Sequence, residues 1–135
     1  QFDASVFFQT ALGFDIFNIH DFYYSTKNFQ GNVMDKAYSK NKLVSQNPVV
    51  SDYFLEPGDY LKLSSLNIGY TLNLNKRFID SVRIFATSNN LFTITKFSGI
   101  DPSTWEVNGL TPGATGSRSY YPNTRQFMLG MQIEF

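Results

Sequence analysis

The chain has 135 residues, with 11 basic and 11 acidic side chains, a formal net charge of zero and no cysteine. This balance excludes a strong field toward nucleic acid, and the lack of cysteine excludes a disulfide framework or a thiolate metal site. Charged residues make up only 16% of the chain and aromatic residues 17%, which is aromatic-rich and charge-poor for a soluble protein. No apolar run approaches the roughly 18 residues of a spanning helix.

The N-terminal stretch has the alternation of a β-strand. Most even positions from Phe2 to Ile16 are apolar and most odd positions are polar or small, with Phe7 the one clear exception. A period of two marks a strand with one apolar face, so we predict a strand over residues 1–18. At about 3.3 Å per residue it would be on the order of 50 Å long. No signal peptide precedes it, so we expect the chain to be the tail of a longer protein.

A long connection follows over residues 19–59. Within it, the stretch NVMDKAYSK predicts a short helix with Asn32 as its N-cap. The stretch EPGD, residues 56–59, predicts a tight turn with Pro57 and Gly58 in the central positions. That turn would lead directly into the next strand.

Three more strands complete the chain, over residues 60–74, 81–97 and 124–135. In the first of these the apolar residues change parity at Ser64–Ser65, which predicts a β-bulge there. The second has a weaker pattern, and we predict an irregularity at Asn89–Asn90. The turn over residues 75–80 is short, whereas the connection over residues 98–123 is long. The final strand places large apolar residues at every second position: Phe127, Leu129, Met131, Ile133 and Phe135.

The connections indicate how these strands are used. Long connections without secondary structure are uncommon inside compact domains, but short periplasmic turns that alternate with long extracellular loops are typical of an outer-membrane barrel. The predicted fold class is therefore all-β, a transmembrane antiparallel barrel segment with two long extracellular loops. Four strands are too few to close a barrel and would leave open edges in hydrocarbon. The chain is then either part of a larger barrel or one of several copies that build a barrel together.

Few residues suggest chemistry. His20 is the only histidine, and we interpret it as an ordinary loop residue beside Asp21. The carboxylates are scattered without the spacing of a calcium loop, and Asp101 in GIDP is interpreted as a turn or cap residue. We predict no enzyme activity, no catalytic or metal-binding residues and no cofactor.

The last three predicted strands resemble the C-terminal end of the SusC-like, RagA-type TonB-dependent outer-membrane transporters. Three stretches carry the resemblance: YLKLSSLNIGYTL, SVRIFATSNNLFTITKFSGIDP and YYPNTRQFMLGMQIEF. The matching positions include Gly69, Arg83, Asn90, Gly130 and Phe135. Two features depart from the family pattern: Lys62 stands where arginine is usual, and the second long loop lacks a frequent tryptophan motif.

The resemblance implies the last four strands of a 22-stranded barrel in the outer membrane of a Gram-negative cell. In that family the barrel is filled by a plug, coupled to TonB through an N-terminal part absent from this chain, and closed by a SusD-like surface lipoprotein. The implied function is the import of glycans or peptides. The implied partners are the rest of the barrel and plug, the SusD-like lipoprotein, TonB, the barrel-assembly machinery and the lipid bilayer, with no nucleic acid.

The resemblance also suggests roles for particular residues. The alternating apolar residues of the final strand, ending at Phe135, are similar to the signal read by the barrel-assembly machinery, and the same residues would face lipid. Loop aromatics are candidate contacts to cargo or lid, with Trp105 the first choice, although interfacial anchoring or loop packing is the favoured explanation for any one of them: Trp105, Tyr23, Tyr24, Tyr120 and Tyr121. The expected lumen-facing polar residues, which would hydrate the wall or touch the plug, are Asp3, Gln9, Asp15, Asn67 and Gln132.

Two other functions remain open at this stage. A four-stranded anchor that trimerises in the outer membrane would need a preceding coiled coil and short loops. A soluble β-rich binding module would need further apolar surface to cover its sheet.

Overall fold

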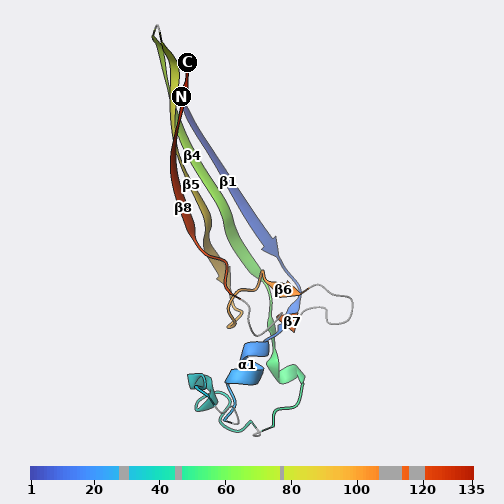
Figure 1. Cartoon of the computed structure of the whole chain (residues 1–135). Helices are drawn as coiled ribbons and strands as arrows, with labels where there is room; N and C mark the ends of the chain where they lie inside the picture. Colours follow the sequence, from blue (N-terminus) through green and yellow to red (C-terminus); the bar gives the residue numbers. More distant parts are fainter. Residues whose placement is uncertain (28–30, 45–46, 77, 107–113, 116–120) are drawn as a thin grey trace. The chain divides into compact units, whose positions relative to one another are not determined.

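The computed structural model describes residues 1–27, 31–44, 47–76, 78–106, 114–115 and 121–135. The chain divides into two compact units. We call residues 1–10, 61–94 and 123–135 the sheet unit, and residues 11–60 and 95–122 the loop unit. Figure 1 shows the elements of both.

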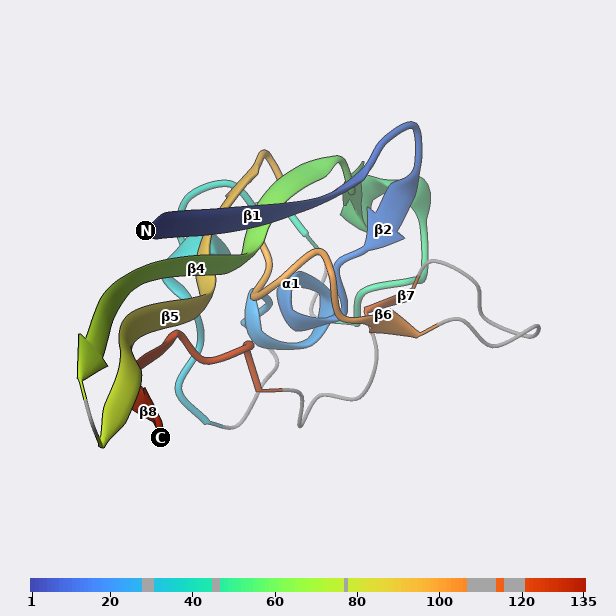
Figure 2. The same ribbon diagram turned by 90° about the horizontal axis from the view of Figure 1, so that it is seen from above.

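The sheet unit is one four-stranded sheet in the order β1-β4-β5-β8. Its strands are β1 (Phe2–Ala11), β4 (Tyr60–Lys76), β5 (Ile79–Thr95) and β8 (Gln126–Glu134). Gln1 and Thr71 donate their backbone N–H groups to each other's carbonyls, as in an antiparallel ladder. Strands β5 and β8 are antiparallel from Ser81↔Glu134 to Asn89↔Gln126. The all-β prediction is confirmed, and Figure 2 shows the four strands side by side from above.

The sheet unit has almost no core of its own. Among the described residues its only buried apolar side chain is Leu63. Strands β1 and β8 form the two edges, since each pairs with one strand only within the sheet. A sheet with one buried apolar side chain and open edges needs a cover for its apolar face and a partner for each edge.

The loop unit has a small fold with its own core. A second sheet has the order β3-β2-β7-β6, made of β2 (Asp15–Phe17), β3 (Leu55–Pro57), β6 (Trp105–Glu106) and β7 (Ala114–Thr115). The helix α1 (Ile19–Tyr24) and the 3₁₀ turns η1 (Asp35–Ala37) and η2 (Asp52–Phe54) complete it. Its buried apolar residues are Ile16, Ala37, Phe54, Tyr60 and Phe97. No helix among the residues placed by the structure is long and apolar enough to cross a membrane.

The first strand is shorter than predicted. It ends at Ala11 instead of continuing to residue 18, and the chain then enters β2 of the other sheet. Gly13 causes the break, because its φ of 77° lies in the left-handed region that favours glycine. The Asp59 carboxylate accepts a hydrogen bond of 2.6 Å from the Gly13 amide, which stabilises this corner.

The helix was predicted in the wrong place. The stretch from Asn32 forms only the single turn η1, whose N-cap is Met34 without a side-chain cap. The real helix α1 begins after Asn18, whose carbonyl oxygen Oδ1 accepts from the Asp21 amide at 3.0 Å. An Asn cap satisfies one of the free N–H groups of a first turn.

The EPGD stretch is not the predicted tight turn. Pro57 ends β3, and Gly58 does not adopt a positive φ. Gly58 is instead a point of close approach, because a Cβ there would lie 2.5 Å from the ring of Phe14 and 2.7 Å from Ile16. Its amide donates to the Phe14 carbonyl at 2.8 Å.

Two irregularities agree with the sequence patterns. Asn90 has a φ of 53°, as the predicted irregularity requires, and its side-chain amide donates to the Thr124 carbonyl at 3.2 Å. Ser64 and Ser65 both contact polar side chains of the same face, namely Gln9 at 3.4 Å and Asn67 at 3.3 Å. Two consecutive residues on one face support the predicted change of parity.

Candidate functional site: the two faces of the long sheet

One face of the sheet unit carries an ion pair that crosses three strands. The Arg83 guanidinium of β5 donates to both carboxylate oxygens of Asp3 on β1, at 2.6 and 3.3 Å. It passes over Gly69 of the intervening β4, where a Cβ would lie 2.6 Å from the guanidinium and from the Asp3 carboxylate. The missing side chain of Gly69 is therefore what allows this bidentate pair to form.

The same layer continues to the fourth strand through an aromatic ring. The Arg83 guanidinium lies 5.3 Å from the centroid of the Phe85 ring, a cation–π contact. Phe85 is the cross-strand partner of Gly130 on β8, and a Cβ on Gly130 would overlap the ring. The ring thus covers a glycine, as in the aromatic pairing of strand glycines.

A row of hydrogen bonds lies beside this layer. The Asn67 side chain on β4 donates to the Ser5 hydroxyl at 3.2 Å and accepts from the Thr87 hydroxyl at 2.7 Å. Closer to the β4–β5 turn, the Ser81 hydroxyl donates to Glu134 at 3.0 Å. This face of the sheet, which we call the polar face, satisfies much of its hydrogen bonding across strands.

The opposite face is apolar and exposed within this chain. On each strand most residues of one parity are large and apolar, whereas those of the other parity lie on the polar face. Most of the large side chains of the apolar face are more than a third exposed and belong to all four strands: Phe2, Val6, Phe8, Ile68, Tyr70, Leu72, Leu74, Ile84, Phe92, Ile94, Phe127, Leu129, Met131 and Ile133. A continuous face of this kind is far larger than the apolar patches that soluble monomers tolerate.

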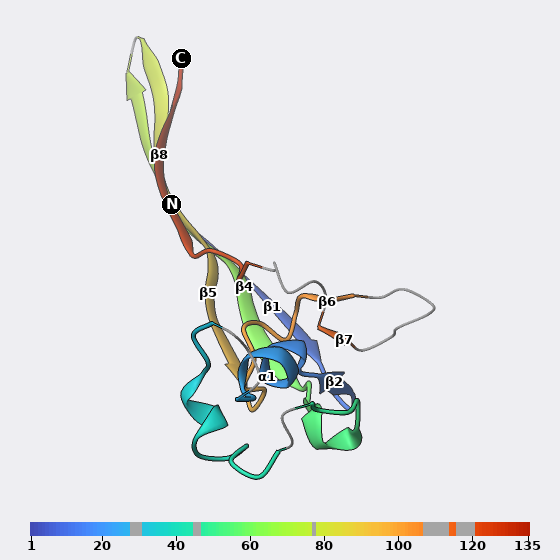
Figure 3. The same cartoon turned by 60° about the horizontal axis from the view of Figure 1, so that its bottom comes forward.

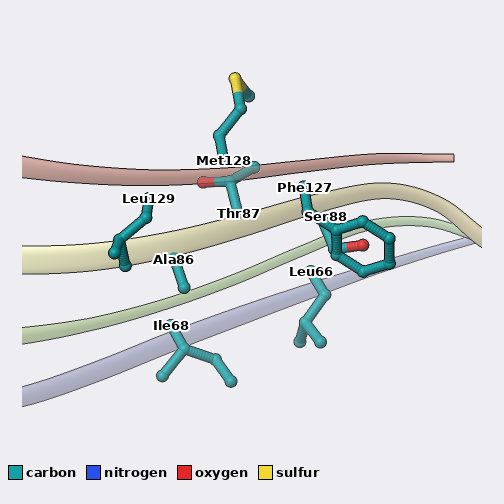
Figure 4. A pocket seen from close by; sticks show the side chains of 8 residues that line it. All are labelled: Leu66, Ile68, Ala86, Thr87, Ser88, Phe127, Met128 and Leu129. Carbon is teal, nitrogen blue, oxygen red and sulfur yellow. The ribbon is translucent and has the colours of Figure 1, made fainter.

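The apolar face has a shallow trough over β5. The small residues Ala86 and Ser88 lie between Leu66 and Ile68 of β4 and Phe127 and Leu129 of β8. In Figure 4 the side chains of Thr87 and Met128 point to the other face. The Ser88 side chain is 8% exposed, and its hydroxyl has no hydrogen-bond partner among the residues that the structure describes.

Four of the five residues predicted for the terminal strand lie together on this apolar face. Phe127, Leu129, Met131 and Ile133 alternate along the edge strand β8, and Phe135 follows its end. Leu129 is 81% exposed and Phe135 84% exposed. The structure thus gathers the predicted residues on one open edge; their role in assembly remains a prediction.

The predicted loop aromatics that the structure describes come from different segments. Tyr23 packs edge-on against Phe22 with centroids 5.0 Å apart, and Tyr24 stacks on His20 at 6.1 Å. Both tyrosines belong to α1, as does His20, which we had assigned to a loop. The backbone of Trp105 lies in β6. Tyr121 is largely exposed, and Tyr120 lies outside the described residues.

The expected polar residues divide between the two units. Asp3, Gln9 and Asn67 lie on the polar face, where they contact neighbouring strands, and Gln132 is the cross-strand partner of Arg83. Asp15 was wrongly placed among them, because it begins β2 in the loop unit.

Sequence reasoning missed a polar cluster in the loop unit. Glu56 accepts hydrogen bonds from the amide and hydroxyl of Ser98, both at 2.7 Å, and from the Asn18 side chain at 3.3 Å. Burial alone would raise the pKa of Glu56, but these hydrogen bonds and the charge of Lys36 outweigh it and hold the pKa below its usual value. Asp21 lies in the same cluster, buried, beside Lys36 and Lys40.

This cluster does not have the composition of a metal site. Two ammonium groups balance the two carboxylates. No group of three or more metal-ligating His, Cys, Asp or Glu side chains occurs in the described part of the chain. Asp101, in contrast, has the turn-capping role that GIDP predicted: it accepts from the Ser103 amide at 2.8 Å and the Ser103 hydroxyl at 2.7 Å.

Comparison with known proteins finds relatives among the TonB-dependent receptors. The chain is 27% identical over its whole length to TonB-dependent receptor P3 of Formosa agariphila and covers 15% of that protein. It is 31% identical to the TonB-dependent receptor SusC of Bacteroides thetaiotaomicron over 69% of this chain and 9% of that protein. The chain is related to the SusC-like TonB-dependent receptors. No protein-family profile matches it.

Solved structures show the same fold. The chain superposes on part of the RagAB peptide importer with TM-scores of 0.72 in the closed-closed state and 0.73 in the open-open state, at 24% identity in both. The match covers 99% of this chain and 16% of the matched chain of the importer. This SusC-like chain therefore spans only about one sixth or less of the relatives that it matches.

Proposed function

We propose that the chain is a wall segment of an outer-membrane β-barrel that imports nutrients in a TonB-dependent way. The observation that carries the proposal is the two-faced sheet, with a continuous exposed apolar face, a hydrogen-bonded polar face and two open edges. Lipid covers the apolar face, the polar face lines the lumen, and further strands of the same barrel pair with β1 and β8.

The relatives support this reading over the two others. They are named as receptors and as a peptide importer, not as enzymes, and the fold match lies within a much longer chain. That favours one large barrel over a trimer of four-stranded anchors. A soluble module is disfavoured because the sheet unit has a single buried apolar side chain in its described part.

The partners in this proposal follow from the family. A SusD-like lipoprotein lies over the loop unit on the outside of the cell, the plug contacts the polar face, and TonB acts on a part of the protein outside this chain. The barrel-assembly machinery recognises the terminal strand through Phe127, Leu129, Met131, Ile133 and Phe135. Cargo is a glycan or a peptide, and the aromatic residues Tyr23, Tyr24, Trp105, Tyr120 and Tyr121 are candidate contacts to cargo or lid.

Spin labels along β8 test the proposal. The chain contains no cysteine, so single cysteines placed at Leu129, Met131 and Ile133 give unique labels in this part of the full-length protein. In lipid bilayers we expect the labels to collide readily with oxygen, which dissolves in lipid, and rarely with a water-soluble nickel chelate.

The matched control is Met128→Cys. Met128 is as apolar as its neighbours, yet it pairs with Thr87 on the polar face. A label there should show low oxygen accessibility, so that accessibility alternates along the strand. Equal access of the nickel chelate to all four positions would mean that the apolar face is in water and would overturn the proposal.

A further inference from the structure

The loop unit carries a surface segment, residues 34–44, that we call the strap. It contains η1 and the turns after it, and Figures 1 and 3 both show it beside α1. Only Ala37 and Asn41 of the strap are buried, while Tyr38 is 64% exposed and Leu43 is 95% exposed. One buried methyl group is too little apolar area to hold a segment of this length in place.

Polar contacts to Asp21 hold the strap instead. The Asp21 side chain is 1% exposed, and its Oδ1 accepts from the Asn41 side chain at 2.9 Å. Its Oδ2 has no hydrogen-bond partner in the described part of the chain, but faces the ammonium groups of Lys36 at 3.8 Å and Lys40 at 3.9 Å. Three residues of the strap thus converge on one buried carboxylate.

The remaining attachments of the strap are also polar. Lys40 lies 3.8 Å from Glu56 Oε1, and Lys36 donates to the Ser98 hydroxyl at 2.6 Å. Tyr53 donates to the side chain of Asn41 at 2.9 Å. Each of these contacts depends on a charged group or on Asn41. Two further bonds do not: the Met34 amide donates to the Tyr24 carbonyl at 2.8 Å, where the strap begins, and the Tyr53 hydroxyl also donates to the Lys40 carbonyl at 3.2 Å.

The contact between the strap and the rest of the loop unit is also incompletely packed. A cavity of about 290 Å³ lies beside it. Met34 and Lys36 line it from the strap, and Asp21, His20, Ser98 and Ile100 are among the residues that line it from the other side. A surface closed by packing would lack such a space.

We infer that the strap is a separable element, held on the loop unit by the charge of Asp21 and released when that charge is removed while α1 stays folded. Helix α1 has its own supports: Asn18 caps it through the backbone amide of Asp21, and Phe22 packs edge-on against Phe54 with centroids 5.2 Å apart. Neither support uses the Asp21 carboxylate. The inference concerns the loop unit alone and does not require the sheet to lie in a membrane.

Hydrogen exchange of the full-length protein carrying Asp21→Asn tests the inference. The substitution preserves the size of the side chain and removes its charge. The amides of Ala37, Tyr38 and Asn41, which donate to carbonyls within the strap, should exchange about tenfold faster or more. The amides of α1, including Phe22, should keep their protection.

Two further variants make the test decisive. Asp52→Asn removes one exposed carboxylate from the same unit and should leave exchange in the strap unchanged. The double variant Lys36→Gln with Lys40→Gln should loosen the strap as Asp21→Asn does. Unchanged protection of the strap in Asp21→Asn, or equal loosening of α1 and strap, would overturn the inference.

Discussion

At the scale of single residues, the glycines of the polar face explain how its side chains cross between strands. Gly69 leaves room for the Arg83–Asp3 pair, and Gly130 leaves room for the Phe85 ring. Neither glycine has a positive φ, since Gly13 is the only described glycine that does. Their role is to lack a side chain where a long neighbour must lie flat, and not to permit a turn.

Substitution of Gly130 should therefore cost stability only while Phe85 is present. Gly130→Ala forces the Phe85 ring off the strand, and we expect a loss of about 1–3 kcal/mol, the usual range for overpacking. In a Phe85→Ala background the same substitution should cost much less. Unfolding midpoints of the four proteins of this cycle measure the coupling, and additive effects would mean that the ring does not depend on the glycine.

Glu56 should make the loop unit sensitive to acid. The pKa of Glu56 is lower in the folded protein than in the unfolded chain, where it is about 4.3. Ionised Glu56 therefore stabilises the fold fully above the unfolded pKa, and this stabilisation is lost as the pH falls through the folded pKa. Protection of the Ser98 amide, corrected for the intrinsic pH dependence of exchange, should fall below about pH 4. In Glu56→Gln this fall should disappear; a fall of the same size in the variant would assign it to another group.

At the scale of elements, strand β8 has to serve two environments with adjacent residues. Leu129 pairs with Ala86 on the apolar face, and Met128 pairs with Thr87 on the polar face. Because successive side chains point to opposite faces, one step along the strand moves a side chain from the proposed lipid to the proposed lumen. The two neighbours are apolar and partly exposed alike, so only their faces differ.

A charge on β8 should be costly on one face and tolerated on the other. We expect Leu129→Arg to reduce the free energy of unfolding in lipid by about 2–3 kcal/mol. Met128→Arg should change it by about 0.5 kcal/mol or less. Unfolding by denaturant in lipid vesicles compares the two, and equal losses would show that the faces do not meet different solvents.

At the scale of the whole molecule, the two units rely on different sources of stability. The loop unit has buried apolar side chains and a buried polar cluster of its own. The sheet unit lacks such a core in its described part and depends on whatever covers its apolar face. The two units should therefore respond separately to large changes.

Removal of much of the loop unit should leave barrel assembly intact. Phe17 and Leu55 are cross-strand partners in β2 and β3, so a short Gly-Asn turn in place of residues 19–54 can close a hairpin. The full-length variant should still reach the outer membrane and migrate as a folded barrel in unheated gels. The proposed SusD-like lipoprotein should no longer co-purify; co-purification at the normal level would place its contacts elsewhere.

Several features of the fold were accessible from sequence because they depend on local pattern. Alternation located all four long strands, and the break in the pattern of β5 located Asn90. Helix α1 was missed because six residues are too few to display a helical period. The Asn18 cap before Asp21 was a usable signal, since Asn followed by an acidic residue in the first turn is typical of a helix start.

The two-faced long strands of this SusC-like chain could be predicted without a structure, because period-two alternation depends only on which residues follow one another. Tertiary structure alone decided where the first strand ends and which distant residues meet. Asp21, Lys36, Asn41, Glu56 and Ser98 lie on four separate segments, and no spacing in the chain indicates that they form one cluster. Their meeting follows from burial, because a buried carboxylate is stable only where hydrogen bonds or opposite charges are supplied to it by other parts of the chain.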